Sequence, residues 1–369
     1  MLSIGIAGGG LLGRLLAWQL SRLGHRVTVL DPAAAPQACF TSQRPAGSRP
    51  QAAGFTAAGM LSPVAELDHA VPAIAALGWR SIDLWRNITA QLPGTPWFAQ
   101  QGSLLLAHRS DLPSARRVLA RIAHAMQSPE WHGPENCSPQ ALAADDLQRI
   151  EPSLQGIAHA WVLPHEAQID AVATMDGLLA GASHAAWQWG TQVTSVTPGA
   201  LHTTRGMQRF DIAIDTRGTG AAPELPVRGV RGEMLWLHAP GLALQRPLRL
   251  LHPRHRVYIV PRPGGMVLVG ASEIESDDGS PVSVRSTLEL LAAGHGVLPA
   301  LAEARIVHLD SNVRPALPDN APRIDCSDGL LRINGLFRHG WLLAPALVEQ
   351  AMAQMLSDSS TSKPLDAAV

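Results

Sequence analysis

The chain has 369 residues, of which 46% are hydrophobic and 16% are charged, and its formal net charge is −1 at pH 7. This length can hold two domains with a large core, and the charge balance gives no reason to expect a nucleic-acid or anionic-membrane partner. The sequence has no apolar run of about 18 residues that could span a membrane. Its only lysine, Lys363, lies in the tail, which argues against Schiff-base chemistry at a pocket lysine.

The spacing of cysteine and histidine gives no indication of a disulfide-rich or metal-binding protein. The three cysteines are far apart and form no C-x-x-C pair, and the histidines show neither H-E-x-x-H nor a paired Cys/His spacing. We therefore expect free thiols in a reducing compartment and no metal site. Because no basic segment precedes the first apolar run, we also expect no signal peptide and a cytoplasmic protein.

The first 31 residues predict the order strand, turn, helix, strand. Residues 2–7 form a short apolar run that is typical of a buried strand. Residues 11–23 carry apolar side chains at helical spacing, and residues 26–30 form a second apolar strand. A unit of this kind binds a dinucleotide when the turn after its first strand is rich in glycine.

That turn holds Gly8, Gly10 and Gly13 in the pattern G-x-G-x-x-G. The first glycine allows a tight turn, the second lets the backbone approach a pyrophosphate, and the third allows the helix to pack closely on the strand. The helix directs the positive end of its dipole at the phosphates. Asp31 is placed to accept hydrogen bonds from the adenosine ribose. The pattern predicts a dinucleotide site and leaves both NAD and FAD open.

Apolar periodicity predicts alternating helices and strands in the rest of the chain. Residues 32–58 indicate a loop, and the small residues at 54–63 allow backbone to approach a ligand. A second glycine loop at 216–222 follows a strand and adds Gly218 to the candidate cofactor residues. Helices are predicted at 71–92, 112–126, 171–186, 283–293 and 341–356, with another capped by Ser138, and strands at 103–107, 158–164, 210–215, 232–237, 257–260, 266–270, 304–310 and 330–334.

Two of these helices carry features that test the prediction. Pro345 falls in the first turn of the helix at 341–356, where its missing N–H costs little. Arg116, Arg117 and Arg121 lie on the polar side of the helix at 112–126, and we expect them to face solvent.

Strand–glycine–helix signals near both ends of the chain predict a discontinuous cofactor domain. We expect an α/β (α+β) fold, in which a Rossmann-like dinucleotide-binding domain contains an inserted substrate domain with a mixed or antiparallel sheet. The predicted cofactor domain comprises residues 1–80, 145–220 and 311–356, and the substrate domain comprises residues 81–144 and 221–310. The Ser-rich residues 357–369 are predicted to be a disordered tail.

Six motifs stand in a fixed order between residues 8 and 346. They are the G-x-G-x-x-G turn, Ala-Ala-Gly-Met-Leu at 57–61, Val-Tyr-Ile-Val-Pro-Arg at 257–262, Val-Gly-Ala-Ser-Glu at 269–273, Val-Arg-Pro-Ala-Leu-Pro-Asp at 313–319 and Phe-Arg-His-Gly-Trp-Leu-Leu-Ala-Pro-Ala at 337–346. In this combination the chain resembles the FAD-dependent D-amino-acid oxidase superfamily and, within it, the glycine oxidases of the thiamine-biosynthetic type.

The resemblance implies non-covalent FAD and the oxidation of a primary or secondary amine beside a carboxylate. It places phosphate contacts on Leu11 and Leu12 and the ribose contact on Asp31. A helix that begins near Gly340 would stabilise negative charge on the reduced flavin. The other implied contacts are Ala58, Gly59 and Met60 beside the flavin, Val193 beside adenine, and Leu336, Phe337, Arg338, His339, Gly340, Trp341 and Leu342 near flavin N1 and O2.

The resemblance also implies how the substrate carboxylate is bound. Arg314 matches the arginine that grips it through two parallel bonds, and Tyr258 and Arg338 match a tyrosine and a second arginine that assist. Taken without the resemblance, Arg314 could form a structural ion pair, Arg338 a surface or interdomain pair, and Tyr258 could fill a core position.

One stretch and two single positions depart from the family's pattern. The stretch Asp215-Thr-Arg-Gly-Thr-Gly replaces a more usual Ala-Ser/Ala-Gly pattern with an aromatic residue following. Arg256 and His339 stand where the family often has His and Asn, and they add polar bulk and charge near the expected pocket mouth. The substrate could therefore be larger, more polar or more anionic than glycine. Cys326 does not match the position at which some relatives attach flavin covalently.

The function expected from this resemblance is oxidative deamination of a small amino acid or amine. Hydride passes from the substrate Cα to flavin N5, an imine forms, and oxygen takes the electrons to give hydrogen peroxide. The alternatives are an FAD dehydrogenase that serves a quinone or a partner protein, a non-catalytic flavoprotein subunit and an NAD-dependent dehydrogenase. The resemblance is also compatible with a homo-oligomer.

Overall fold

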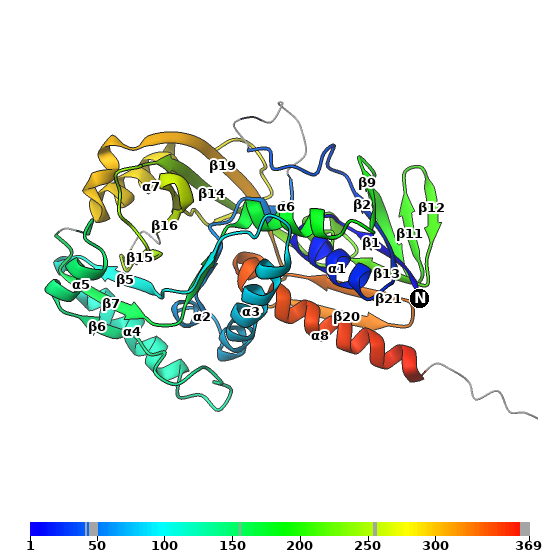
Figure 1. The fold of residues 1–369 in the computed structure, drawn as a ribbon, viewed down its shortest axis with the longest axis horizontal. Helices are drawn as coiled ribbons and strands as arrows, with labels where there is room; N and C mark the ends of the chain where they lie inside the picture. Colours follow the sequence, from blue (N-terminus) through cyan, green and yellow to red (C-terminus); the bar gives the residue numbers. More distant parts are fainter. Residues whose placement is uncertain (41–42, 44–50, 155, 254–256, 362–369) are drawn as a thin grey trace, which may run out of the picture.

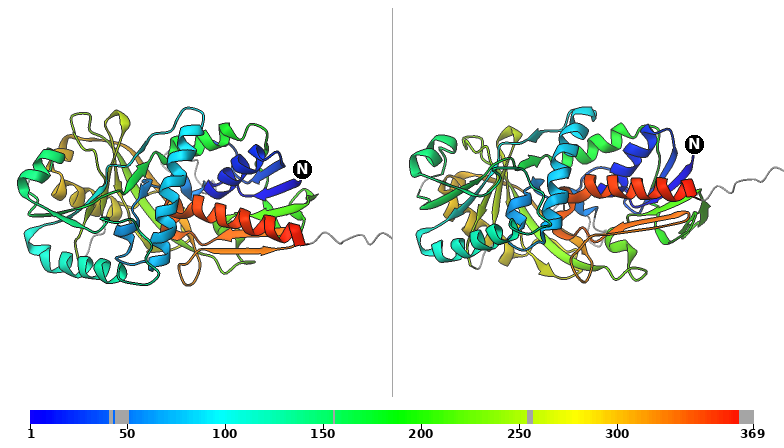
Figure 2. Two further views of the ribbon diagram at one scale, coloured as in Figure 1. Left: turned by 60° about the horizontal axis from the view of Figure 1, so that its bottom comes forward. Right: turned by 90° about the horizontal axis from the view of Figure 1, so that it is seen from below.

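Two large β-sheets lie next to each other along the long axis of the molecule (Figures 1 and 2). The computed structural model describes residues 1–40, 43, 51–154, 156–253 and 257–361. Part of the predicted loop at 32–58, Arg256, and residues 362–369 of the predicted tail lie outside the described residues. The mixed α/β class that the sequence predicts is confirmed.

The first sheet has six strands in the order β20-β21-β13-β1-β2-β9. Its centre joins distant parts of the chain, because β1 is parallel to both β2 and β13, and β13 is parallel to β21. Successive side chains of β1 point to opposite faces, so Ile4 and Ile6 enter one core and Ala7 enters another. The strands are β1 (Ser3–Ala7), β2 (Arg26–Asp31), β9 (Ala186–Trp189), β13 (Ile212–Asp215), β20 (Arg323–Ser327) and β21 (Leu330–Asn334).

Both faces of this sheet are covered. Helix α1 (Leu11–Arg22) buries Leu12, Leu16 and Leu20, which recur every four residues, and it contacts α6 (Ala171–Gly181) and α8 (Gly340–Thr361). The opposite face packs against a small antiparallel sheet of β10 (Val193–Thr197), β11 (Ala200–Thr203) and β12 (Gly206–Arg209).

The second sheet has nine strands, in the order β18-β14-β17-β16-β15-β5-β7-β6, and β19 pairs with β14. It has its own apolar core, against which α7 (Val284–Val297) packs. Helices α4 (Leu112–Ala125) and α5 (Ala144–Ile150) lie at the β5–β7 end (Figure 1). The strands are β5 (Ser103–Ala107), β6 (Gln140–Leu142), β7 (His159–Leu163), β14 (Arg228–His238), β15 (Leu248–Leu250), β16 (Tyr258–Arg262), β17 (Met266–Gly270), β18 (Ile274–Glu275) and β19 (Arg305–Ala316).

Short elements lie between the two sheets in the view of Figure 1. Helix α2 (Pro63–Glu66) leads into the long helix α3 (Pro72–Gln91). A three-stranded sheet joins β3 (Met60–Leu61), β8 (Ala167–Ile169) and β4 (Phe98–Ala99) in the order β3-β8-β4. No helix of the described residues is long and apolar enough to cross a membrane.

Two predicted helices are wrong in part, because strand pairing overrides local propensity. Ser138 does not cap a helix: residues 140–142 pair with β7 as β6, and α5 begins only at Ala144. The helix predicted at 171–186 ends at Gly181, since Ala186 and the residues after it pair with β2 as β9.

The sheets also do not follow the predicted domain boundaries. Strand β7, which falls in the predicted cofactor segment 145–220, pairs with β5 in the nine-stranded sheet. Strand β19 continues through the predicted boundary at residue 311, and it pairs along β14 as far as Ala316. Arg314 therefore lies on a long, paired strand.

Helix α8 differs from the prediction at both ends. It begins at Gly340 and extends to Thr361, five residues into the predicted tail, and Pro345 therefore lies beyond its first turn. A proline there leaves the carbonyl four residues earlier without its helical donor. That carbonyl belongs to Trp341, and it accepts a hydrogen bond from the indole N–H of Trp85 at 2.7 Å. The side chain of α3 thus replaces the missing backbone donor.

Replacing Trp85 with Phe should lower the free energy of unfolding by about 1–3 kcal/mol more than replacing Trp79 with Phe. Both tryptophans lie buried on α3, but the indole N–H of Trp79 has no hydrogen-bond partner in the described part of the chain, so its loss leaves no acceptor there unsatisfied. Urea unfolding of the two variants measures the difference. Equal destabilisation would show that the Trp341 carbonyl needs no side-chain donor.

Candidate active site

A cavity of about 690 Å³ lies where the two sheets meet. It is lined by almost every residue that the sequence marked as a cofactor or substrate contact, although these residues come from distant segments. Gly13 is the exception. The predicted residues on the lining are Gly8, Gly10, Leu11, Leu12, Asp31, Ala58, Gly59, Met60, Val193, Gly218, Tyr258, Arg314, Leu336, Phe337, Arg338, His339, Gly340, Trp341 and Leu342.

Gly8 and Gly13 of the first turn are each required by a different steric constraint. Gly8 has φ +102°, and a Cβ there would lie 2.6 Å from the carbonyl oxygen of Thr216. A Cβ on Gly13 would lie 1.8 Å from the carbonyl oxygen of Gly8. Gly13 therefore does not line the cavity but lets α1 pack tightly behind the turn, which is the third of the glycine roles expected from the pattern.

Asp31 ends β2 at the edge of the cavity. One oxygen accepts a hydrogen bond from the backbone N–H of Gly9 at 2.6 Å, and the other accepts from the N–H of Ala33 at 2.8 Å. The carboxylate thereby holds the glycine turn against the end of the second strand. Its predicted contact with a ribose stays a prediction.

Arg262 holds the loop at 58–60 in place. Its buried guanidinium donates to the carbonyl oxygens of Ala58 and Ile169, the latter at 2.8 Å, and to the side-chain oxygen of Gln168 at 3.1 Å. Burial lowers the pKa of Arg262 to about 10. Gly59 has φ +63°, and a Cβ there would lie 2.1 Å from the Ile169 carbonyl oxygen, so the loop is pressed against β8.

The C-terminal segment enters the cavity through a strained turn. Phe337 has φ +48°, which is unusual for a bulky residue and costs about 1–3 kcal/mol. Helix α8 starts three residues later at Gly340, where a Cβ would meet no atom of another described segment within 4 Å. The positive N-terminal end of α8 therefore adjoins open space in the cavity.

At the other end of the cavity, two glycines make room for larger side chains. A Cβ on Gly270 would lie 2.6 Å from the hydroxyl oxygen of Tyr258, and a Cβ on Gly232 would lie 2.2 Å from a terminal nitrogen of Arg314. Tyr258 and Arg314 are both partly buried. Burial raises the pKa of Tyr258, against the opposing charge of Arg314, and burial lowers the pKa of Arg314.

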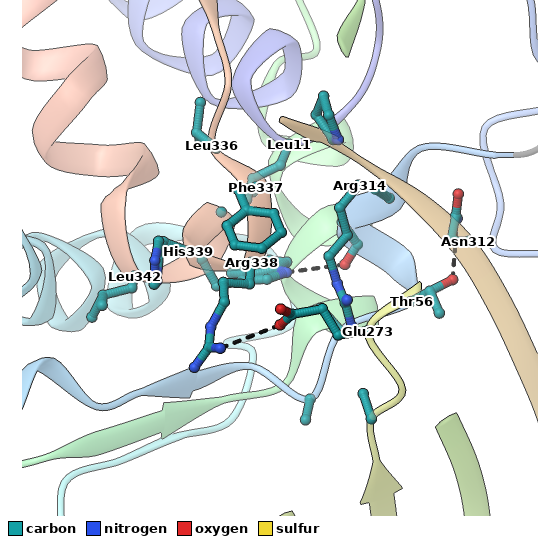
Figure 3. A pocket seen from close by; sticks show the side chains of 18 of the residues that line it. Leu11, Thr56, Glu273, Asn312, Arg314, Leu336, Phe337, Arg338, His339 and Leu342 are labelled. Carbon is teal, nitrogen blue, oxygen red and sulfur yellow. Dashed lines mark hydrogen bonds and ion pairs between the residues drawn. The ribbon is translucent and has the colours of Figure 1, made fainter. Parts of the chain in front are cut away.

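The Arg314 guanidinium has little of its bonding capacity in use. Nη1 donates to the carbonyl oxygen of Ser272 at 3.2 Å. Among the residues that the structure describes, no carboxylate forms an ion pair with it. Figure 3 shows Arg314 reaching into the same part of the cavity as Glu273 and Phe337.

Arg338, in contrast, is held by two carboxylates. Its Nη2 lies 2.8 Å from an oxygen of Glu66, and its Nη1 lies 3.3 Å from an oxygen of Glu273. The other oxygen of Glu66 lies 2.8 Å from Arg249. Burial alone would raise the pKa of Glu66, but the charges of Arg338 and Arg249 outweigh it and hold that pKa far below its usual range. Glu66, Arg249 and Glu273 were not among the predicted site residues.

His339 differs from expectation, whereas the basic side of α4 faces solvent as predicted. His339 is buried beside Glu66, with Nδ1 3.4 Å from a carboxylate oxygen, and burial lowers its pKa. It therefore does not bring a charge to the cavity mouth. Arg116, Arg117 and Arg121 are exposed, as expected. Arg117 and Arg121 also line the cavity, and Arg121 forms an ion pair with Asp68.

Sequence signals for the missed residues were weak. Glu66 follows the motif at 57–61 by a few residues, and Glu273 is the last residue of the motif at 269–273. Only the fold brings these two glutamates together with Arg249. Arg262 ends a recognised motif on an apolar strand, and a charge at that place is a signal for a buried partner.

Comparison with known proteins identifies the family. The family described as "DAO: FAD dependent oxidoreductase" matches residues 3–354. A protein of Rhizobium etli that carries the name thiamine biosynthesis oxidoreductase ThiO is 36% identical over 355 residues, which cover 96% of each chain. The chain belongs to the DAO family of FAD-dependent oxidoreductases.

Further relatives of this FAD-dependent oxidoreductase agree in name and fold. The glycine oxidase of Bacillus licheniformis is 26% identical over 375 residues, covering 95% of this chain and 92% of that one. Iminodiacetate oxidase of Chelativorans sp. BNC1 has a TM-score of 0.80 at 23% identity, covering 99% and 97% of the two chains. Glycine oxidase of Geobacillus kaustophilus has a TM-score of 0.79 at 22% identity with the same coverage.

The cavity of this FAD-dependent oxidoreductase fits its cofactor. The glycine turn leaves no room for a side chain at Gly8, the N-terminus of α1 follows it, and Asp31 stands at the end of the second strand. At the other end, the space beside Gly340 is open. Cys326 lies on β20 and is not part of the lining. No group of three or more His, Cys, Asp or Glu side chains within the described ranges is placed to hold a metal ion.

Glu166 supports the segment that carries Glu66 into the site. Its buried carboxylate accepts hydrogen bonds from the backbone N–H groups of Val64 and Ala65, each at 3.0 Å, and from the hydroxyl of Ser103. Burial raises the pKa of Glu166 from 4.5 to about 7. The folded protein thus keeps a proton on this side chain that the unfolded chain releases.

The contribution of Glu166 to stability should be complete below pH 4.5 and should be lost as the pH rises through about 7. Glu166→Gln imitates the protonated acid and should not show this loss. The free energy of unfolding of the wild type should therefore fall relative to that of the variant as the pH rises over this range. A difference that does not change with pH would show that Glu166 titrates alike in both states.

Proposed function

We propose that this oxidoreductase oxidises a small amino acid, or a related amine that carries a carboxylate, in the manner of a glycine oxidase. The amine loses two electrons and two hydrogens, its C–N bond becomes an imine, and water then hydrolyses the imine to an oxo acid and ammonia. Dioxygen takes the two electrons and two protons and leaves as hydrogen peroxide.

One observation carries this proposal. Arg314 lines the cavity on a firmly paired strand, and it has no carboxylate partner among the described residues. A partly buried guanidinium without an anion favours a ligand that supplies one. The names of two relatives, a ThiO protein and a glycine oxidase, support the same class of substrate.

Particular residues would hold the cofactor. Gly8, Gly10 and the start of α1 would bind the phosphates, Asp31 the ribose, and the segments at 58–60 and 336–342 the flavin side. Bound FAD supplies the acceptor for the hydride that leaves the substrate Cα. Everything else in the reaction is a matter of binding and orientation by side chains of this chain.

Arg314 and Tyr258 orient the substrate. The guanidinium grips the carboxylate through two parallel charge-assisted hydrogen bonds, and the Tyr258 hydroxyl donates a third. When the carboxylate is fixed, the Cα–H bond of the substrate is held in one orientation in the cavity. This orientation is the main contribution of the protein to catalysis. Arg338 contributes positive potential, since both of its terminal nitrogens already bind glutamates. No general base is needed when the amine binds in its neutral form.

Replacing Arg314 with Ala should raise the Michaelis constant for amino acids by about 100-fold or more, because two charge-assisted bonds of about 1.5–3 kcal/mol each are lost. FAD content, read from visible absorbance, should stay at the wild-type level. Arg305→Ala is the matched control, since Arg305 begins the same strand with its side chain 75% exposed. Unchanged turnover of amino acids by the Arg314 variant would contradict the proposed anchor.

The electron acceptor is tested separately from the substrate. Hydrogen peroxide that appears in air at the rate of amine loss supports oxygen as the acceptor. A quinone that restores turnover without peroxide would replace the oxidase with a dehydrogenase. Holoprotein whose flavin absorbance is unaffected by amino acids under anaerobic conditions would leave a non-catalytic subunit as the better account.

A further inference from the structure

The end of the cavity that holds Arg314 has an unequal charge balance. The charged group around Arg314 consists of Arg249, Arg314 and Arg338 with the carboxylates Glu66 and Glu273. Arg117, Arg121 and Asp68 also line the cavity, outside this group, and Arg121 is paired with Asp68. Two negative charges face three positive ones, so a ligand with one carboxylate balances this group. A ligand with a second carboxylate would place an excess negative charge in a partly desolvated site.

The two glutamates are held very differently. Glu66 is buried, and both of its oxygens are used, by Arg249 and by Arg338 with His339. It is therefore part of the fixed wall. Glu273 has a side chain that is 40% exposed, and only one of its oxygens contacts Arg338, at the longer distance of 3.3 Å. Its carboxylate is the one that a ligand would meet.

Glu273 also faces the substrate anchor. Figure 3 shows its carboxylate between the guanidinium groups of Arg338 and Arg314. Its charge acts on Arg314 as well as on Arg338. Glu273 is thus placed next to the position that the rest of a ligand would occupy when its carboxylate is bound to Arg314.

We infer that Glu273 is a specificity-determining residue, which restricts the cavity to substrates with a single carboxylate. This inference rests on the proposed function, since it assumes that Arg314 binds the substrate carboxylate. Glu273 binds Nη1 of Arg338, the terminal nitrogen that Glu66 does not use, so this arginine cannot bind a second carboxylate of the substrate. The negative charge of Glu273 also repels such a carboxylate directly. The polar mouth predicted from Arg256 and His339 suggested an anionic substrate; the placement of Glu273 opposes an additional negative charge.

Removal of this charge has a specific consequence. Glu273→Gln keeps the size of the side chain but frees the Nη1 side of Arg338 and increases the excess of positive charge in this group. A second carboxylate is then attracted where it was repelled. Binding of a monocarboxylate changes less, because its partner is Arg314 in both proteins.

The test is isothermal titration calorimetry of the FAD-loaded protein with acetate and with malonate, which carry one and two carboxylates. The ionic strength is held constant, because screening weakens exposed charges. Wild type should bind acetate at least as tightly as malonate. Glu273→Gln should raise the malonate-to-acetate affinity ratio by about tenfold or more. Glu275→Gln is the matched control, because Glu275 lies two residues away, pairs with Arg228 and is not on the cavity lining.

Each outcome decides between the claims. A ratio that rises in Glu273→Gln and not in Glu275→Gln supports the inference, whether or not any amine is oxidised. An unchanged ratio, or a wild type that already prefers malonate, would overturn the specificity role and leave amine oxidation standing. Failure of the wild type to bind acetate would remove the carboxylate anchor and with it both proposals. Glu273→Ala gives a second measurement of the same ratio.

Discussion

The buried carboxylate of Glu66 is the contact on which the site depends. It joins Arg249, on the nine-stranded sheet, to Arg338, in the turn before α8. A buried ion pair of this kind adds little net stability, because desolvation of the charges offsets their attraction. Removing one partner would leave an unpaired buried charge, so the arrangement fixes geometry more than it adds energy. The two halves of the cavity are thereby held in one relative position.

From this fixed wall the rest of the site follows. Arg338 is bound by two glutamates, whereas Arg314 lines the cavity without a carboxylate partner among the described residues. Gly232 and Gly270 give Arg314 and Tyr258 the room to reach the cavity. On the cofactor side, Arg262 and Asp31 perform a similar task, since each binds backbone groups of a loop that must approach the ligand closely. Charged side chains thus position the backbone at the cofactor end of the cavity, and at the substrate end they determine which charge a ligand can carry.

Much of this could be read from the sequence, and the reason is local. The glycine turn, Asp31 and the strand–helix–strand order are set by short-range sterics and apolar periodicity, and each appears as expected. Most of the other predicted residues on the cavity lining were found by resemblance, which carries positions over but not their partners. Arg338 is the example: its position was predicted, but its two glutamates were not.

What could not be predicted depends on long-range pairing. Residues 140–142 and 186–189 form strands only because β7 and β2 offer them an edge. Glu66, Arg249 and Glu273 are far apart in sequence, and no local pattern says that their side chains meet. The same holds for the bond from Trp85 to the Trp341 carbonyl, which depends on how α3 crosses α8.

A crystal structure of the FAD-loaded protein with acetate tests the central claim most directly. The account predicts that the acetate carboxylate lies against the guanidinium of Arg314 within reach of the Tyr258 hydroxyl, with Arg338 still bound to Glu66. Acetate bound elsewhere, or an Arg314 that keeps only its contact to the Ser272 carbonyl, would contradict it.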